Sequence, residues 1–168
     1  MTRLAVVCDT TLLLYLGRID RADLLCTLFS PVYVPEAVLL ELDMGRLIRR
    51  DTIEPRELDW IEIVRVSEAL IDRLPSNRLG MGERAVIAYA HAHHIELAGL
   101  DDLRARQLAE ELDLGVVGIL GVLLRAKRAA LIPTIRPLVD ALIVQGFRIG
   151  SDLYQDVLEM AQEGISSC

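Results

Sequence analysis

The chain opens with a short apolar run that stops abruptly at polar residues. Residues 4–8 (Leu-Ala-Val-Val-Cys) are apolar, and Asp9, Thr10 and Thr11 follow them. An apolar run bounded in this way predicts a buried strand. Asp9 then lies just past the carboxyl end of the strand, where ligands bind in open α/β sheets. Asp is also a favoured N-cap, and for Asp9 taken alone this purely structural role is the better explanation.

Short apolar segments alternate with helical segments along the rest of the chain. Further strands are expected near residues 32–34, 60–66, 96–100 and 116–117. Helices are expected over residues 11–16, 20–29, 35–42, 67–74, 83–94, 103–112, 118–128, 135–145 and 151–162. Such alternation predicts an α/β fold with a mainly parallel sheet of four or five strands and helices on both faces. The charged segment 46–59 predicts a short helix and a loop, and 75–82 a turn-rich break.

Composition narrows the class of protein. A chain of 168 residues with 52% hydrophobic residues is expected to form one soluble domain. The net charge of −7 argues against strong non-specific binding of nucleic acid, but it is compatible with a nuclease whose carboxylates hold metal ions. Cys8, Cys26 and Cys168 lack zinc-site spacing and predict reduced thiols in a cytoplasm. The longest apolar run, residues 114–124, is too short to span a bilayer.

Acidic residues follow the expected strands or lie in the expected helices. Asp101 and Asp102 follow one strand, and Glu83 lies in the first turn of a helix, where a carboxylate also suits the helix dipole. Glu41 stands on an otherwise apolar helix, so it needs a partner or a metal if it is buried. Glu36 competes with Glu41, but five residues place the two roughly 140° apart on a helix. Glu36 is therefore expected in the solvated first turn.

Convergence of these carboxylates with Asp9 would create a site of like charges. Such charges raise one another's pKa values unless a counter-ion is present. Oxygen ligands without His or Cys favour Mg²⁺ or Mn²⁺ over zinc. A divalent ion held there could orient a phosphodiester and activate water for its hydrolysis.

Four motifs resemble those of PIN-domain proteins, a fold found in many metal-dependent ribonucleases, including VapC-like toxins. Asp9 and Thr10 match the first aspartate and the hydroxyl residue that follows it. Residues 35–41 resemble the "P-x-x-V-x-x-E" helix, which selects Glu41. The Gly82-Glu83 pair and the "D-D-x-x-x-R" run at residues 101–106 match the remaining acidic motifs. Many PIN proteins carry Asp where this chain has Glu83.

A further similarity points to one branch of prokaryotic PIN proteins. Residues 118–127 match a "G-x-L-G-x-L-x-x-A-K" helix, and residues 145–149 match a shared tail. The resemblance implies a PIN-like three-layer α/β/α domain over residues 1–168, with a core of about residues 1–130 and a helical extension of about residues 131–168.

The resemblance also implies the roles of the site residues. Mg²⁺ or Mn²⁺ would be held by Asp9, Glu41, Glu83 and Asp102, with Asp101 as a ligand or a supporting residue. The choice between Asp101 and Asp102 stays open, although the spacing to Arg106 favours Asp102. Thr10 would orient Asp9 or a metal-bound water.

The implied activity is that of a ribonuclease acting on RNA, as the toxin of a toxin–antitoxin pair. A cognate antitoxin and a homodimer are implied partners, and apolar residues in 11–29 and 37–42 would either form such a surface or be buried. The alternative is a PIN-fold interaction module without useful catalysis.

Two other groups of residues have simpler explanations than a metal site or an RNA-binding site. His91, His93 and His94 suit a helix C-terminus better than a metal site. The basic residues of the later helices either contact RNA phosphates or are solvated: Arg104, Arg106, Arg125, Lys127 and Arg128.

Overall fold

The central layer of the molecule is a parallel sheet. The computed structural model describes residues 2–75 and 78–164. Their strands are β1 (Val6–Cys8), β2 (Val32–Pro35), β3 (Ile61–Val64), β4 (Leu97–Gly99) and β5 (Gly115–Val117). The order is β3-β2-β1-β4-β5, and every neighbouring pair is parallel. The expected parallel sheet is confirmed, and the segment expected at 60–66 forms an edge strand.

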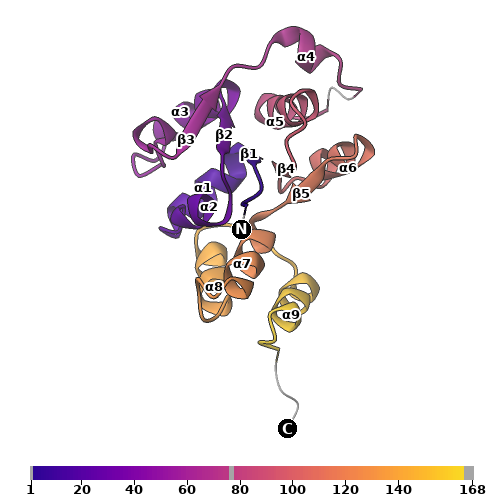
Figure 1. Cartoon of the computed structure of the whole chain (residues 1–168). Helices are drawn as coiled ribbons and strands as arrows, with labels where there is room; N and C mark the ends of the chain where they lie inside the picture. Colours follow the sequence, from indigo (N-terminus) through magenta and orange to yellow (C-terminus); the bar gives the residue numbers. More distant parts are fainter. Residues whose placement is uncertain (1, 76–77, 165–168) are drawn as a thin grey trace.

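Helices cover both faces of the sheet, as expected. α5 packs on β1, β2 and β4 with α6 beside it, whereas α1, α2 and α7 pack together on the other face (Figure 1). The helices of the described residues are α1 (Thr10–Arg18), α2 (Asp23–Leu28), α3 (Glu36–Arg46), the short 3₁₀ helix η1 (Pro55–Glu57), α4 (Glu68–Asp72), α5 (Met81–Ala92), α6 (Leu103–Glu111), α7 (Ile119–Arg128), α8 (Arg136–Val144) and α9 (Ser151–Met160).

Some helix boundaries differ from the expected ones. α1 begins at Thr10, one residue early, because the Asp9 side chain caps its first turn. α2 begins only at Asp23, since Asp20 has a φ of 57°, in the left-handed region that a helix cannot contain. α3 continues past its expected end at residue 42 to Arg46. The turn-rich break at 75–82 falls partly on residues 76–77, which lie outside the described residues.

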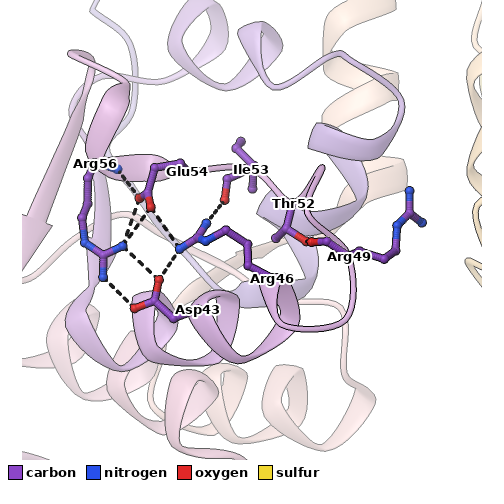
Figure 2. Close-up of polar contacts among 7 residues, drawn as sticks. All are labelled: Asp43, Arg46, Arg49, Thr52, Ile53, Glu54 and Arg56. Carbon is purple, nitrogen blue, oxygen red and sulfur yellow. Dashed lines mark hydrogen bonds and ion pairs between the residues drawn. The ribbon is translucent and has the colours of Figure 1, made fainter.

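The segment after α3 contains the expected short helix, η1, and a loop that an ion network holds against α3. The Arg46 guanidinium lies between Asp43 and Glu54 and donates to the Ile53 carbonyl at 2.7 Å (Figure 2). Arg56 also binds Asp43 and Glu54, at 2.8 and 3.0 Å. The loop is therefore pinned to the end of α3, which explains why that helix extends beyond its apolar stretch.

Most apolar residues of the early helices are buried in the core rather than exposed as an interaction surface. The residues with at most 5% exposure include Leu12, Leu13, Leu16, Leu24, Leu25, Val38, Leu39 and Leu42. Leu40 is the exception within these segments, with 65% exposure. In helix α5, Ala85 and Ala88 pack near α4 and Ala92 is exposed, while Val86 and Ala90 face the main core.

The C-terminal helices share the main core. Val139 and Leu142 of α8, together with Val157 and Leu158 of α9, belong to the same apolar cluster as β1. No helix of the described residues combines the length and apolar character needed to cross a membrane. Cys8 and Cys26 are free thiols, and Cys168 lies outside the described residues.

Candidate functional site

Asp9 both caps a helix and occupies the carboxyl end of the central strand. Its carboxylate accepts a hydrogen bond from Leu12 N at 2.8 Å, and its backbone N–H donates to the Gly99 carbonyl at 3.0 Å. The residue is only 2% exposed. Burial raises the pKa of Asp9 well above its ordinary value, the Leu12 hydrogen bond opposes the rise, and Asp101 and Glu83 add to it by charge repulsion. Asp9 therefore caps α1 and also interacts with the other carboxylates of the candidate site.

Glu41 connects the first turns of two helices. The Thr10 hydroxyl donates to Glu41 Oε2, and the backbone N–H of Gly82 donates to Glu41 Oε1 at 2.9 Å. A Cβ atom on Gly82 would lie 2.7 Å from Glu41 Oε2, closer than real contacts allow. Glycine at this position thus makes room for the carboxylate. Thr10, expected to orient Asp9 or a water, instead bonds to Glu41.

Glu83 is partly buried in the first turn of α5. Its side chain accepts a hydrogen bond from Gly80 N at 3.1 Å, so it also serves the helix N-terminus. Burial raises its pKa, the Gly80 hydrogen bond opposes the rise, and repulsion from Asp102 and Glu41 adds to it. Both the structural and the functional interpretations of Glu83 remain compatible with this position.

Asp101 and Asp102 point to different surroundings although they are adjacent in the chain. Asp101 accepts from Ile119 N at the start of α7, at 3.2 Å to each oxygen. Burial raises the pKa of Asp101 to about 6, against the opposing effects of the Ile119 hydrogen bond and the Arg106 charge. Asp102 is exposed and caps α6 by accepting from Ala105 N at 3.0 Å. Asp101, rather than Asp102, therefore interacts with Asp9.

A second glycine accommodates Asp101. A Cβ atom on Gly118 would lie 2.6 Å from Asp101 Oδ1. Gly118 follows β5 directly and precedes α7, so the carboxylate sits against a glycine at a helix N-terminus. The site roles of Gly82 and Gly118 were not anticipated. A glycine at the start of a helix beside an acidic motif is the signal that could have found them.

Charge repulsion between pairs connects the five carboxylates at the carboxyl edge of the sheet. Repulsion links Asp9 with Asp101 and Glu83, and links Glu83 with Asp102 and Glu41. The ion pairs found in the described residues include none of the five. We refer to these five residues as the carboxylate cluster.

The donor chemistry of the cluster suits a hard divalent cation. All its side-chain ligands are oxygen atoms, which Mg²⁺ and Mn²⁺ prefer. Gly82 and Gly118 leave space beside two of the carboxylates that a Cβ would fill. Within residues 2–75 and 78–164, no three His, Cys, Asp or Glu side chains stand in a group that could hold a metal ion as placed. The carboxylates thus adjoin without forming a finished coordination shell.

The competing candidates lie elsewhere. Glu36 is exposed at the start of α3 and pairs with Arg65 at 3.4 Å. His93 follows the C-terminus of α5, at the opposite end from Glu83, and its ring packs on Tyr89 with centroids 4.3 Å apart. Among the later basic residues, Lys127 is bound by Glu163 at 2.9 Å, which gives it a structural role.

Comparison with known proteins agrees with the resemblance drawn from the motifs. A family model described as a PIN domain matches residues 5–163. No curated protein matches the chain.

Proposed function

Because the chain belongs to the PIN-domain family, whose members are generally nucleases that use divalent metals, we propose that it is a metal-dependent endoribonuclease. The observation that carries the proposal is the carboxylate cluster, five acidic residues at one sheet edge that are in none of the ion pairs found in the described residues. Asp9 is its most buried member, with 2% exposure. A buried acid without a cationic partner is costly, and a metal ligand is a role that accounts for it.

The residues have distinct roles in this proposal. Asp9, Glu41, Glu83 and one of Asp101 and Asp102 would hold Mg²⁺ or Mn²⁺, and the burial of Asp101 favours it over Asp102. The Thr10 hydroxyl and Gly82 N–H hold both oxygens of Glu41 in place. Ile119 N holds Asp101.

The cluster would act on an RNA phosphodiester. A bound divalent ion would supply Lewis-acid stabilisation of the phosphate and lower the pKa of an attacking water. Carboxylates with raised pKa values can also accept a proton from that water near neutral pH. The chain would thus hydrolyse the bond without a covalent intermediate on the protein.

Incubation of labelled single-stranded and structured RNAs with the purified chain tests the proposal. We expect cleavage with Mn²⁺ or Mg²⁺, none with EDTA, and a loss of about 100-fold or more in Asp9→Asn, since the metal contributes several kcal/mol. Glu36→Gln is the matched control, because Glu36 is an exposed acid outside the cluster. Cleavage that Asp9→Asn leaves intact would refute the site. Absence of both cleavage and metal binding would favour the interaction module.

The toxin role is proposed from the family alone. We expect expression of the chain to arrest growth, and co-expression of a small protein from an adjoining gene to relieve the arrest. Asp9→Asn should not arrest growth. A homodimer and an antitoxin partner stay predictions until the complex is isolated and its mass measured.

A further inference from the structure

A groove beside β5 and α7 adjoins the carboxylate cluster. Its volume is about 930 Å³, and its lining includes Asp101 of the cluster and Gly118, the residue before α7. α7 forms one side, and residues of the loop before α9 and of α9 itself form another. The ten residues of α7 span about 15 Å at a rise of about 1.5 Å each. The groove therefore extends from the proposed site along the length of a helix.

Basic residues dominate the charge of this groove. Four arginines line it (Arg106, Arg125, Arg128 and Arg148), whereas Asp101 is its one acidic lining residue. The whole chain carries a net charge of −7, so this distribution runs against its overall charge. Such a local concentration of arginine attracts an anionic ligand.

The guanidinium groups of the groove are available for a ligand. None of the four arginines forms an ion pair with an acid in the described parts of the chain. The Arg125 guanidinium carbon lies 5.8 Å from the centre of the Phe29 ring, which positions it without neutralising its charge. Arg128 and Arg148 are exposed.

Helix α9 is held firmly as a wall of the groove. Lys127 Nζ on α7 donates to Glu163 Oε2 at 2.9 Å and also to the Ala161 carbonyl. Glu163 accepts from Ile135 N at 2.8 Å and from Arg136 N at 3.2 Å. These bonds hold the pKa of Glu163 below its ordinary value although burial acts to raise it. The part of the C-terminal extension that the structure describes, up to residue 164, thus supplies a fixed surface.

We propose that this groove binds the sugar–phosphate backbone of single-stranded RNA and leads it to Asp101 at the carboxylate cluster. The inference rests on the proposed function. Guanidinium groups bind phosphate oxygens in a bidentate manner, so arginines along a groove suit a phosphodiester chain. An acidic peptide would satisfy the same charges, but only a phosphodiester has a reacting group for the cluster at the end of the groove. The C-terminal helices would thus act in substrate positioning.

Binding of a 5′-fluorescent single-stranded RNA in EDTA tests the groove without cleavage. We expect the double variant Arg128→Ala with Arg148→Ala to bind about tenfold more weakly at moderate salt. The slope of log K against log salt should fall by about 1.4, since each lost phosphate contact on a single strand contributes about 0.7. Arg73→Ala is the matched control, because Arg73 is exposed and follows α4, a helix that lies at the opposite end of the molecule from α7 and α9 in Figure 1. Circular dichroism and Tm of each variant establish that it is folded.

Three outcomes would overturn the groove: wild-type affinity and slope in the double variant, equal weakening by Arg73→Ala, or stronger competition by poly-glutamate than by unlabelled RNA. Single-stranded DNA is included as a competitor to show whether the ribose contributes. The proposed ribonuclease activity and the proposed RNA-binding groove can each be refuted without the other. Metal-dependent cleavage abolished by Asp9→Asn, with unchanged RNA binding by the arginine variants, refutes the groove alone. Binding that depends on the arginines without any cleavage refutes the ribonuclease alone.

Discussion

Two regions of this protein that contain several acidic residues shift the pKa values of their carboxylates in opposite directions. In the ion network beyond α3, Asp43 faces Arg56 and Arg46, which lower its pKa to about 2 (Figure 2). In the carboxylate cluster, burial and neighbouring acids raise the pKa of Asp9, and burial raises that of Asp101 to about 6. In the first region arginines form ion pairs with the acid, whereas in the second the Arg106 charge only opposes the rise at Asp101 and no ion pair of the cluster is found within the described residues.

Under the proposed function, this difference separates a structural carboxylate from a metal ligand. A carboxylate already paired with guanidinium groups is stabilised in its charged form and has little left to offer a ligand. A buried carboxylate among other acids gains free energy when a cation arrives from solution. Substitutions in the two regions should therefore have opposite consequences for activity, metal binding and stability.

The largest effect on activity is expected from substitution of the two glycines that lie beside carboxylates of the cluster. Gly82→Ala would displace Glu41, and Gly118→Ala would displace Asp101, because the new Cβ would lie within 2.7 Å of a carboxylate oxygen. Misplacement of a catalytic group by about 1 Å can cost about 100-fold in rate. We expect a loss of ribonuclease activity of that order in each variant.

Gly45 in α3 provides the control for these two variants. A Cβ atom there meets nothing within 4 Å, so Gly45→Ala should leave activity unchanged and stabilise α3 by up to about 1 kcal/mol. Steady-state cleavage and thermal unfolding measure both quantities. Full activity of Gly82→Ala would show that the position of Glu41 is unimportant.

The second-largest effect is stabilisation by a bound metal, which should distinguish the carboxylate cluster from the ion network. Mn²⁺ at about 100 times its dissociation constant should stabilise the protein by about 2.7 kcal/mol. For a chain of this size that is a rise in Tm of about 5–10 °C. Asp43→Asn should retain this rise and Asp9→Asn should lose it, as measured by scanning fluorimetry. An equal rise in Asp9→Asn would place the metal elsewhere.

The third effect is a dependence of stability on pH. The pKa of Asp101 is about 6 in the folded protein against an ordinary 3.8, so its ionisation destabilises the metal-free fold as the pH rises from about 4 to about 6. Asp101→Asn should raise the free energy of unfolding at pH 7 in EDTA by about 1–3 kcal/mol, as each pKa unit is about 1.4 kcal/mol. The gain should vanish near pH 4. Urea unfolding at both pH values measures it, and a gain independent of pH would contradict the electrostatic cause.

The smallest effect is expected in the ion network. Arg56→Ala removes ion pairs to Asp43 and Glu54 that are exposed to solvent, so it should lower Tm only slightly. High salt should remove the difference from wild type, because salt screens exposed charges. RNA cleavage by this variant should match that of wild type. A large loss of stability that persists in 1 M salt would mean that the network does more than pair surface charges.

Much of the fold followed from local patterns. Valine-containing runs predicted strands, and their alternation with helical segments predicted the parallel sheet, which is confirmed. Boundaries were less accurate where distant contacts intervene. α3 reaches Arg46 because Arg46 binds Glu54 and Ile53, contacts that no helical periodicity reports.

The candidate site was predicted from strand ends and motif resemblance, but the contacts of its residues were not. Asp9, Glu83 and Asp101 are predicted at helix starts or strand ends, and the structure places them beside one another. The choice between Asp101 and Asp102 could not be made from adjacent positions in a loop. It depends on which side chain turns toward Asp9, and that is set by the Ile119 N–H and the space beside Gly118.

The sequence alone predicted that carboxylates lie at one edge of the sheet. Apolar runs specify the parallel strands, and the residues that directly follow these strands reach the same edge. The tertiary structure decided which of these carboxylates meet, which are paired with arginine, and that α9 and the loop before it line a groove with four arginines and Asp101. The reason is physical. Local patterns record backbone conformation and burial, whereas charge pairing and side-chain direction depend on residues brought together from distant parts of the chain.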